Sequence, residues 1–124
     1  SKDWKIGINT PSVTNFENDI ELVISLNNLS IATSGNYRNF YIIDDKLYHH
    51  EINPKTGYPI SSNLGSVSII SDQSCLDADA LSTMFYTVDN FEIVENLTGV
   101  ESFSILLNED KSFTRVFSSG FPKN

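Results

Sequence analysis

The segment from residue 48 to residue 59 (Tyr-His-His-Glu-Ile-Asn-Pro-Lys-Thr-Gly-Tyr-Pro) gathers the side chains of this chain that are best suited to chemistry. It contains both histidines, His49 and His50, whose imidazoles can take up or give a proton near neutral pH. Pro54 fixes its own φ and Gly57 permits positive φ, so the segment is predicted to turn sharply between two apolar strands. A stiff polar turn presents groups to a ligand. The alternative is a polar hairpin turn with surface histidines.

The two histidines are neighbours in the sequence, so on a strand their side chains point to opposite faces. Only one of them can therefore face a shared site, and sequence periodicity does not say which. Lys55 and Thr56, within the same turn, could contact a phosphate. A solvated lysine is the alternative.

Residues 33–37 (Thr-Ser-Gly-Asn-Tyr) form a second candidate, at the expected end of a strand. A small turn with Ser34 and Gly35 brings backbone N–H groups to a ligand. The pattern is short and common, so a simple turn is the alternative.

The segment 74–88 carries the third candidate, on a predicted helix. Asp79 and Thr83 are four residues apart, which places a carboxylate and a hydroxyl on one helical face, as a partial shell for Mg²⁺. Thr83 could instead back-bond to the Asp79 carbonyl. Asp77 is assigned to capping, because Ser74 and Asp77 form the Ser-x-x-acid pattern of a helix start.

The elements that position these groups follow from hydrophobic periodicity. Strands are predicted at 4–9, 20–26, 29–33, 40–43, 46–50, 65–71, 102–108 and 112–117. The 74–88 helix is expected to bury Leu76, Ala80, Leu81, Met84, Phe85 and Val88, and a shorter helix capped by Asp89 follows to about 97. Strands, then a helical pair, then two strands indicate a single α+β domain over 1–124, a mainly antiparallel sheet with the helices packed on one face.

The composition argues against several classes of partner and binding site. The 124 residues carry a net charge of −8, and their eight basic residues are scattered, so nucleic acid and acidic membrane surfaces are poor partners. Cys75 is the single cysteine, which excludes an internal disulfide and a thiolate zinc site. No apolar run approaches the roughly 20 residues of a membrane span.

Three segments, taken in order, resemble the FAD:protein FMN transferases, the ApbE family: Thr-Ser-Gly-Asn-Tyr at 33–37, the 48–59 segment, and Asp-Ala-Asp-Ala-Leu-Ser-Thr at 77–83. The opening at 3–11 and the Ser-Ser-Gly-Phe at 118–121 also fit that family, so the resemblance covers nearly the whole chain. It implies an ApbE-like fold, related to the T-fold.

The resemblance implies an enzyme that splits FAD and attaches FMN to a threonine of an acceptor flavoprotein, with Mg²⁺. The family's histidine, four residues before the first proline of its motif, falls on His50, which is expected to be catalytic and to lie beside the flavin nucleotide. The family's metal ligands fall on Asp79 and Thr83, with the Ser82 carbonyl as a further ligand. The expected cofactor-binding residues are His50, Ile52, Lys55, Thr56, Ser34 and Gly35.

Family members are substantially longer than this chain, so it is expected to be a carboxy-terminal portion that lacks much of the FAD pocket. Little or no transferase activity is expected from these residues alone. Many members are lipoproteins outside the cytoplasmic membrane, and such an anchor would lie in the missing upstream part. The alternatives are an FAD pyrophosphatase that gives FMN and AMP, and a non-catalytic flavin-binding module.

Overall fold

The computed structural model describes residues 2–11, 19–36, 40–88 and 91–122. Its elements, in chain order, are β1 (Trp4–Asn9), β2 (Ile20–Leu26), β3 (Ser30–Gly35), β4 (Phe40–Ile43), β5 (Lys46–His49), β6 (Leu64–Ser71), α1 (Cys75–Val88), a 3₁₀ helix (Phe91–Asn96), β7 (Val100–Leu107) and β8 (Phe113–Phe117). The predicted strands are therefore present, and each boundary lies within two residues of its predicted place. The α+β class is confirmed.

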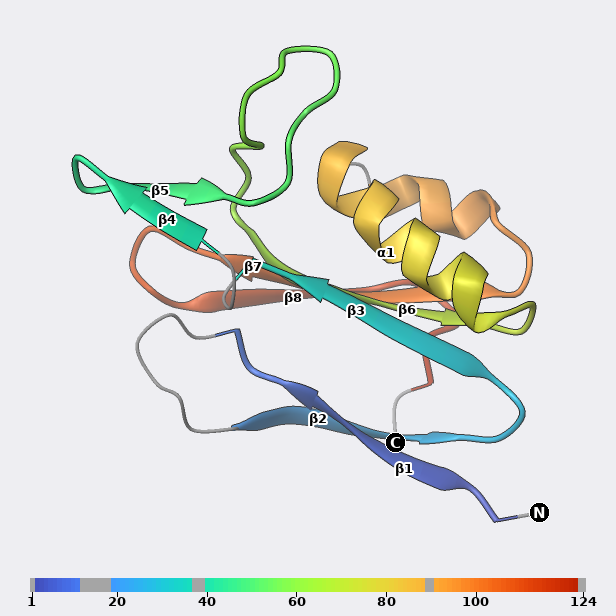
Figure 1. Cartoon of the computed structure of the whole chain (residues 1–124). Coiled ribbons are helices and arrows are strands. Elements are labelled where there is room, and N and C mark those ends of the chain that lie inside the picture. The colour runs from blue at the N-terminus through green and yellow to red at the C-terminus, as the bar shows by residue number, and fades with distance from the viewer. Residues whose placement is uncertain (1, 12–18, 37–39, 89–90, 123–124) are drawn as a thin grey trace.

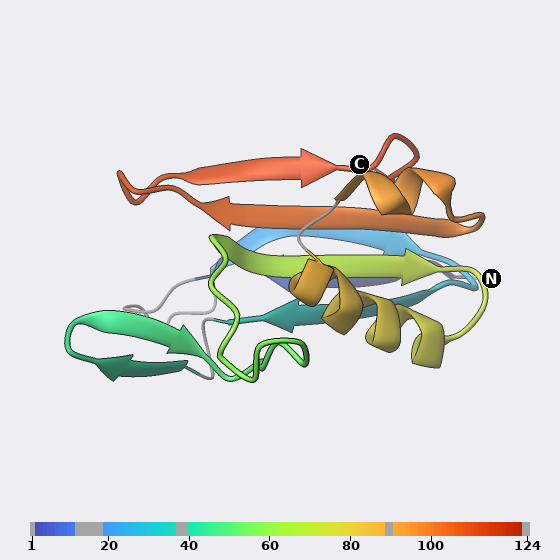
Figure 2. The ribbon, with the colours of Figure 1, turned by 90° about the horizontal axis from the view of Figure 1, so that it is seen from above.

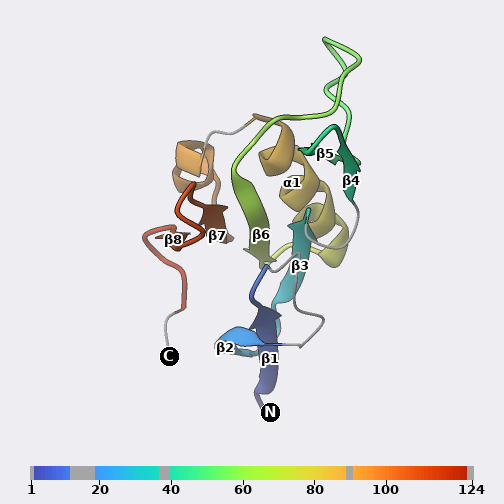
Figure 3. The same ribbon diagram turned by 90° about the vertical axis from the view of Figure 1, so that its left-hand side faces the viewer.

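A four-stranded antiparallel sheet in the order β3–β6–β7–β8 forms the centre of the molecule. The helix α1 packs on β3 and β6 on one face, and the β1–β2 hairpin covers the other face (Figures 1 and 3). Both faces of β6 are therefore covered, and all eight of its residues are buried. The four-stranded sheet, α1 and the β1–β2 hairpin together are called the body.

Two groups of buried side chains hold the body together, one on each face of the sheet. On the helical side the core consists of Leu64, Val67, Ile69, Ala78, Phe85, Tyr86, Val94 and Val100. On the hairpin side it consists of Ile8, Ile24, Leu26, Ile70, Phe103, Ile105 and Phe121. The apolar residues that alternate along the strands thus serve two opposite cores.

The start of α1 agrees with the sequence. The Asp77 N–H donates to Ser74 Oγ at 3.1 Å, and Ser74 Oγ donates to the Asp77 carboxylate at 2.6 Å. This reciprocal pair satisfies a free donor of the first helical turn. The capping role of Asp77 is confirmed.

The predicted buried face of α1 is wrong at most of its positions, with Phe85 buried as predicted. The helix buries Ala78, Ser82, Phe85 and Tyr86, whereas Leu76 is 77% exposed. Of the other predicted core positions, Ala80, Met84 and Val88 are exposed and Leu81 is half-buried. The cause is packing against the sheet: the small side chains of Ala78 and Ser82 let the helix approach the strands, and the Tyr86 hydroxyl donates to strand carbonyls. Apolar periodicity does not register such contacts.

The second helix is a 3₁₀ helix of six residues, so the helical pair consists of one α-helix and one 3₁₀ helix. Short segments commonly take this tighter form. The predicted cap Asp89 lies outside the described residues. Gly99, which follows the helix, has a φ of 74°, a value suited to the glycine expected at a helix end.

Strands β4 and β5 form a separate two-stranded sheet, joined by Asp44 and Asp45, whose φ angles of 50° and 60° are those of a type I′ turn. Residues 40–63, which comprise this hairpin and the turn after it, are called the arm. Figure 2 shows the arm at one end of the central strands. Within the described part of the chain, the arm's two strands pair only with each other.

Candidate functional site

The turn of the arm is held by its own backbone. The Asn53 N–H donates to the Tyr58 carbonyl at 2.9 Å, and the Gly57 N–H donates to the Asn53 carbonyl at 2.8 Å. Asn53 Oδ1 accepts from the Lys55 N–H at 2.9 Å, and Ile52 and Pro59 form a β-bridge. Gly57 has a φ of 72°, the left-handed conformation that the sequence predicts for it. The turn is therefore a stiff, closed loop.

The two histidines differ sharply in environment. His49, the last residue of β5, is 5% exposed, whereas the His50 side chain is 42% exposed. His50 Nε2 lies 3.1 Å from Glu51 Oε1. The structure thus shows His50 as the more exposed of the two histidines, with the Glu51 carboxylate placed to orient its ring, and the role of His50 at a ligand site stays a prediction.

An open cavity of about 520 Å³ lies beside His50 and is lined by Tyr41, Ile43, Tyr48, His49, His50, Ile52 and Pro59. Its lining is mostly apolar and aromatic, which is typical of sites for flat organic groups. Ile52 belongs to this lining, and its cofactor-binding role stays a prediction. Lys55 and Thr56 lie at the exposed tip of the turn, outside the lining, and Thr56 Oγ1 accepts from the Tyr58 N–H at 3.3 Å.

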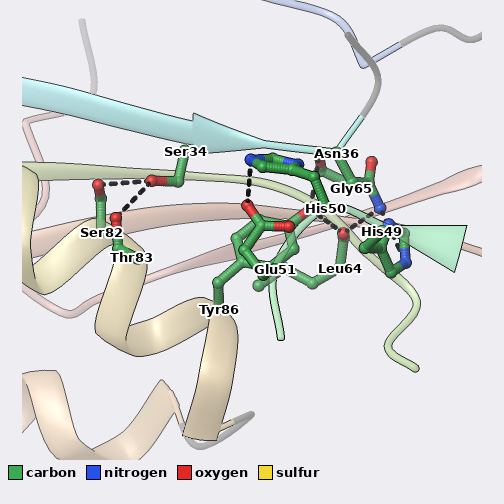
Figure 4. A network of polar contacts seen from close by, with 10 residues as sticks. All are labelled: Ser34, Asn36, His49, His50, Glu51, Leu64, Gly65, Ser82, Thr83 and Tyr86. Atoms are coloured by element: carbon green, nitrogen blue, oxygen red, sulfur yellow. Dashed lines mark hydrogen bonds and ion pairs between the residues drawn. The ribbon is translucent and has the colours of Figure 1, made fainter. Parts of the chain in front are cut away.

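Hydroxyl groups connect the end of β3 with α1. Ser34 Oγ lies 2.8 Å from Ser82 Oγ and 3.4 Å from Thr83 Oγ1 (Figure 4). Ser82 Oγ donates to the Asp79 carbonyl at 2.9 Å. Because each hydroxyl has one proton, Ser82 accepts from Ser34, and Ser34 in turn can accept from Thr83. The back-bond considered for Thr83 is thus made by Ser82.

The proposed metal ligands Asp79 and Thr83 lie one turn apart on α1, and both are exposed. Their carboxylate and hydroxyl oxygens are of the kind that Mg²⁺ prefers, and this ion keeps waters and substrate phosphates as its remaining ligands. Ser82 lies inside α1, where its carbonyl already accepts a helical hydrogen bond. Within residues 2–11, 19–36, 40–88 and 91–122, no three His, Cys, Asp or Glu side chains are placed to hold a metal ion. The donors present fit part of a magnesium shell.

A buried polar cluster joins the arm to the body, and sequence reasoning missed it. Asn36 is 2% exposed, and its Nδ2 donates to the Leu64 carbonyl at 2.8 Å and lies 3.5 Å from His49 Nε2 (Figure 4). The fully buried Tyr86 donates its hydroxyl to the carbonyls of Leu64 and Gly65. Asn36 follows Ser34 by two residues, so the end of β3 connects this cluster to the hydroxyl groups of Ser34, Ser82 and Thr83. Asn36 belongs to the candidate segment 33–37, but nothing in the sequence alone marks Asn36 or Tyr86 as a neighbour of His49.

The sequence of this chain is similar to known sequences along nearly its whole length. The model of the ApbE family matches residues 1–103. An FAD:protein FMN transferase of Haemophilus influenzae is 36% identical over 127 residues, covering 98% of this chain and 35% of that protein. An FAD:protein FMN transferase of Escherichia coli K12 is 44% identical over 80 residues, 64% of this chain and 22% of that protein. This chain therefore spans about a third of the length of the Haemophilus protein and a smaller share of the Escherichia coli protein.

Solved structures agree with the sequence matches. The apo flavinyl transferase ApbE of Pseudomonas stutzeri superposes with a TM-score of 0.75 at 28% identity, covering 96% of this chain and 36% of that one. The flavin transferase ApbE of Vibrio cholerae gives a TM-score of 0.71 at 31% identity, covering 95% of this chain and 36% of that one. The fold of nearly the whole chain is thus that of one portion of these proteins.

Proposed function

Because this chain belongs to the ApbE family, we propose that it is the carboxy-terminal portion of an enzyme that transfers FMN from FAD to a threonine of an acceptor flavoprotein. The observation that carries this proposal is His50, presented by a stiff turn beside an apolar cavity. The names of the relatives support transfer of FMN. The threonine and Mg²⁺ are part of the proposal.

In the proposed reaction, the acceptor's threonine oxygen attacks the phosphorus that carries the riboflavin. A threonine oxygen–phosphorus bond forms, the bond from that phosphorus to the bridging oxygen of the diphosphate breaks, and AMP leaves. Displacement at phosphorus needs alignment and charge neutralisation more than covalent help from the protein.

His50 would accept the threonine proton during the attack. Glu51, 3.1 Å from its Nε2, would orient the ring and stabilise the imidazolium that forms. General-base assistance of this kind contributes about 10²–10⁴-fold to a rate.

The cavity beside His50 would hold part of the flavin nucleotide against Ile52. Ser34 and Gly35, at the end of β3, would meet it from the body. Lys55 and Thr56 would reach its phosphates only from the tip of the turn.

Asp79 and Thr83 would hold Mg²⁺, with the Ser82 carbonyl nearby. The ion, when bound, would neutralise charge on the diphosphate. Ser34 lies 3.4 Å from Thr83 Oγ1 and would help to set the direction of that hydroxyl.

Location is part of the proposal too. None of the described helices is long and apolar enough to cross a membrane. We propose that the longer protein is a lipoprotein outside the cytoplasmic membrane. Fractionation of cells that express the longer protein, with its flavin transferase activity followed in each fraction, tests this placement.

The test is an assay of the full-length protein with FAD, Mg²⁺ and a purified acceptor domain. Mass spectrometry should show one FMN on an acceptor threonine, and AMP release should depend on the acceptor. AMP release at the same rate without acceptor would identify an FAD pyrophosphatase instead. Flavin binding without either product would identify a non-catalytic module.

A further inference from the structure

The arm carries His50, yet little of its backbone is tied to the body. Within the described residues, β4 and β5 form their own two-stranded sheet, and the turn is bonded mainly to itself. An isolated two-stranded hairpin is only marginally stable in water. A catalytic group has to be held to a fraction of an ångström. After the turn, the Leu107 N–H of β7 donates to the Asn63 carbonyl at 2.7 Å, and a further contact is needed to fix the loop that carries His50.

His49 provides such a contact. Its ring is buried and lies edge-on to Tyr86 of α1, with the ring centroids 6.4 Å apart and the planes at 73°. Its Nε2 lies 3.3 Å from the Ser62 carbonyl. His49 and Ser62 stand on either side of the twelve residues 50–61, so this contact closes the loop that contains His50.

The surface that receives His49 belongs to the body. Asn36 Nδ2 lies 3.5 Å from His49 Nε2, a packing contact because Nε2 carries the proton that it donates to the Ser62 carbonyl. Asn36 is bonded to β6 twice, through Nδ2 to the Leu64 carbonyl at 2.8 Å and through its N–H to the Gly65 carbonyl at 3.2 Å. Tyr86 donates to the same two carbonyls. The end of β3, the start of β6 and α1 are thus locked together where His49 enters.

We propose that His49 is a positioning residue. Its contacts with Ser62, Asn36 and Tyr86, together called the clasp, hold the two ends of the 50–61 loop against the body, so that His50 has one defined place beside the cavity. His49 and His50 are consecutive, so a displacement of the first moves the second. The inference rests on the proposed role of His50, but the clasp itself is a statement about structure. It can be tested without any activity.

The test uses the full-length protein and two readouts, hydrogen–deuterium exchange and steady-state kinetics. In His49→Ala, the amides of Asn53, Gly57 and Ile60 should exchange at least about tenfold faster, while those of β6 and β7 keep their protection. The kcat of FMN transfer should fall about 10²-fold with a change of KM for FAD of less than about threefold, because a misplaced His50 affects the reaction step. His49→Gln, whose amide can still donate to Ser62, should recover part of both effects.

Two further variants keep the test decisive. Tyr86→Phe retains the ring beside His49 and removes one hydroxyl, so it should give the same local pattern at smaller size. Ser104→Ala is the matched control: Ser104 is fully buried in β7, its hydroxyl has no hydrogen-bond partner among the described residues, and its removal should change neither readout.

Unchanged exchange in the turn of His49→Ala overturns the proposal. So does faster exchange spread equally over turn and sheet in both His49→Ala and Tyr86→Phe, since His49 would then be an ordinary core residue. If the wild-type protein transfers no FMN, the proposed function fails, and the exchange data still decide on the clasp.

Discussion

The body and the arm of this protein are stabilised in different ways. In the body, a central strand is buried on both faces, and two apolar cores fix the layers. In the arm, Tyr41, Ile42 and Ile43 are more than half exposed, and order comes from a type I′ turn, a closed loop and one buried histidine. The difference shows how a rigid scaffold can carry an accessible reactive group: the body supplies stability, and the arm supplies exposure.

The largest expected difference between the two regions concerns stability. Phe85→Ala in the body should lower the free energy of unfolding by about 3–5 kcal/mol, because the side chain is fully buried. Ile42→Ala in the arm, where the side chain is 64% exposed, should change it by about 0.5 kcal/mol or less. Urea titrations of both variants measure this. Comparable losses would mean that the arm has a core of its own.

The next prediction asks whether the body also contributes to the chemistry. Asp79→Asn should lower kcat of the full-length protein by about 10²-fold and raise the Mg²⁺ concentration needed for half-maximal rate, since a charged ligand is lost. Asp77→Asn is the control on the same helix: it should cost about 1 kcal/mol of stability through the cap and leave the Mg²⁺ dependence unchanged. An unaltered Mg²⁺ titration in Asp79→Asn would confine the chemistry to the arm.

A smaller effect is expected at the turn. Gly57 has positive φ with open space around its Cα, so Gly57→Ala should cost about 1 kcal/mol through backbone strain alone. The loss should appear as faster exchange within residues 50–61, with the body unaffected. Gly57→Asn is the matched variant, because asparagine tolerates this conformation and should restore protection. Equal exchange in all three proteins would show that the loop needs no left-handed residue there.

The smallest effect concerns the pH dependence of the body. Arg115 of β8 donates a hydrogen bond to Glu21 of β2 and thereby holds the pKa of Glu21 below its usual value. A carboxyl whose pKa is lowered in the folded state stabilises the fold above its unfolded pKa, and this contribution disappears as the pH falls through the folded pKa. Glu21→Gln should therefore cost about 0.2–1 kcal/mol at pH 7, with no difference from wild type in strong acid. A difference that persists in acid would assign the loss to packing.

Hydrophobic periodicity predicts the body well, because its strands alternate apolar and polar residues in the usual way. It fails on α1, where Ala78 and Ser82 make the contact with the sheet and Leu76 remains exposed. Small residues that allow close approach carry no apolar signal, so the buried face could not be read from the sequence. The cap at Ser74 is local and could be predicted.

The candidate site also has one part that the sequence predicts and another part that it does not. The turn around Pro54 and Gly57 is local, and the sequence predicts it. The buried histidine, His49, packs against Asn36 and Tyr86. Asn36 lies 13 residues before His49, and Tyr86 lies on the helix α1. Contacts over such separations are decided by tertiary packing, which a single sequence does not display.

Our central proposal is that His50 performs the chemistry while the body supplies most of the stability. The most direct test is the rate of FMN transfer to the acceptor by full-length wild type, His50→Ala and His50→Gln, each with its free energy of unfolding. We expect a fall in kcat of about 10²–10⁴-fold in both variants, with stability changed by about 0.5 kcal/mol or less. Transfer at close to the wild-type rate by His50→Ala would contradict the assignment of His50 as the catalytic base.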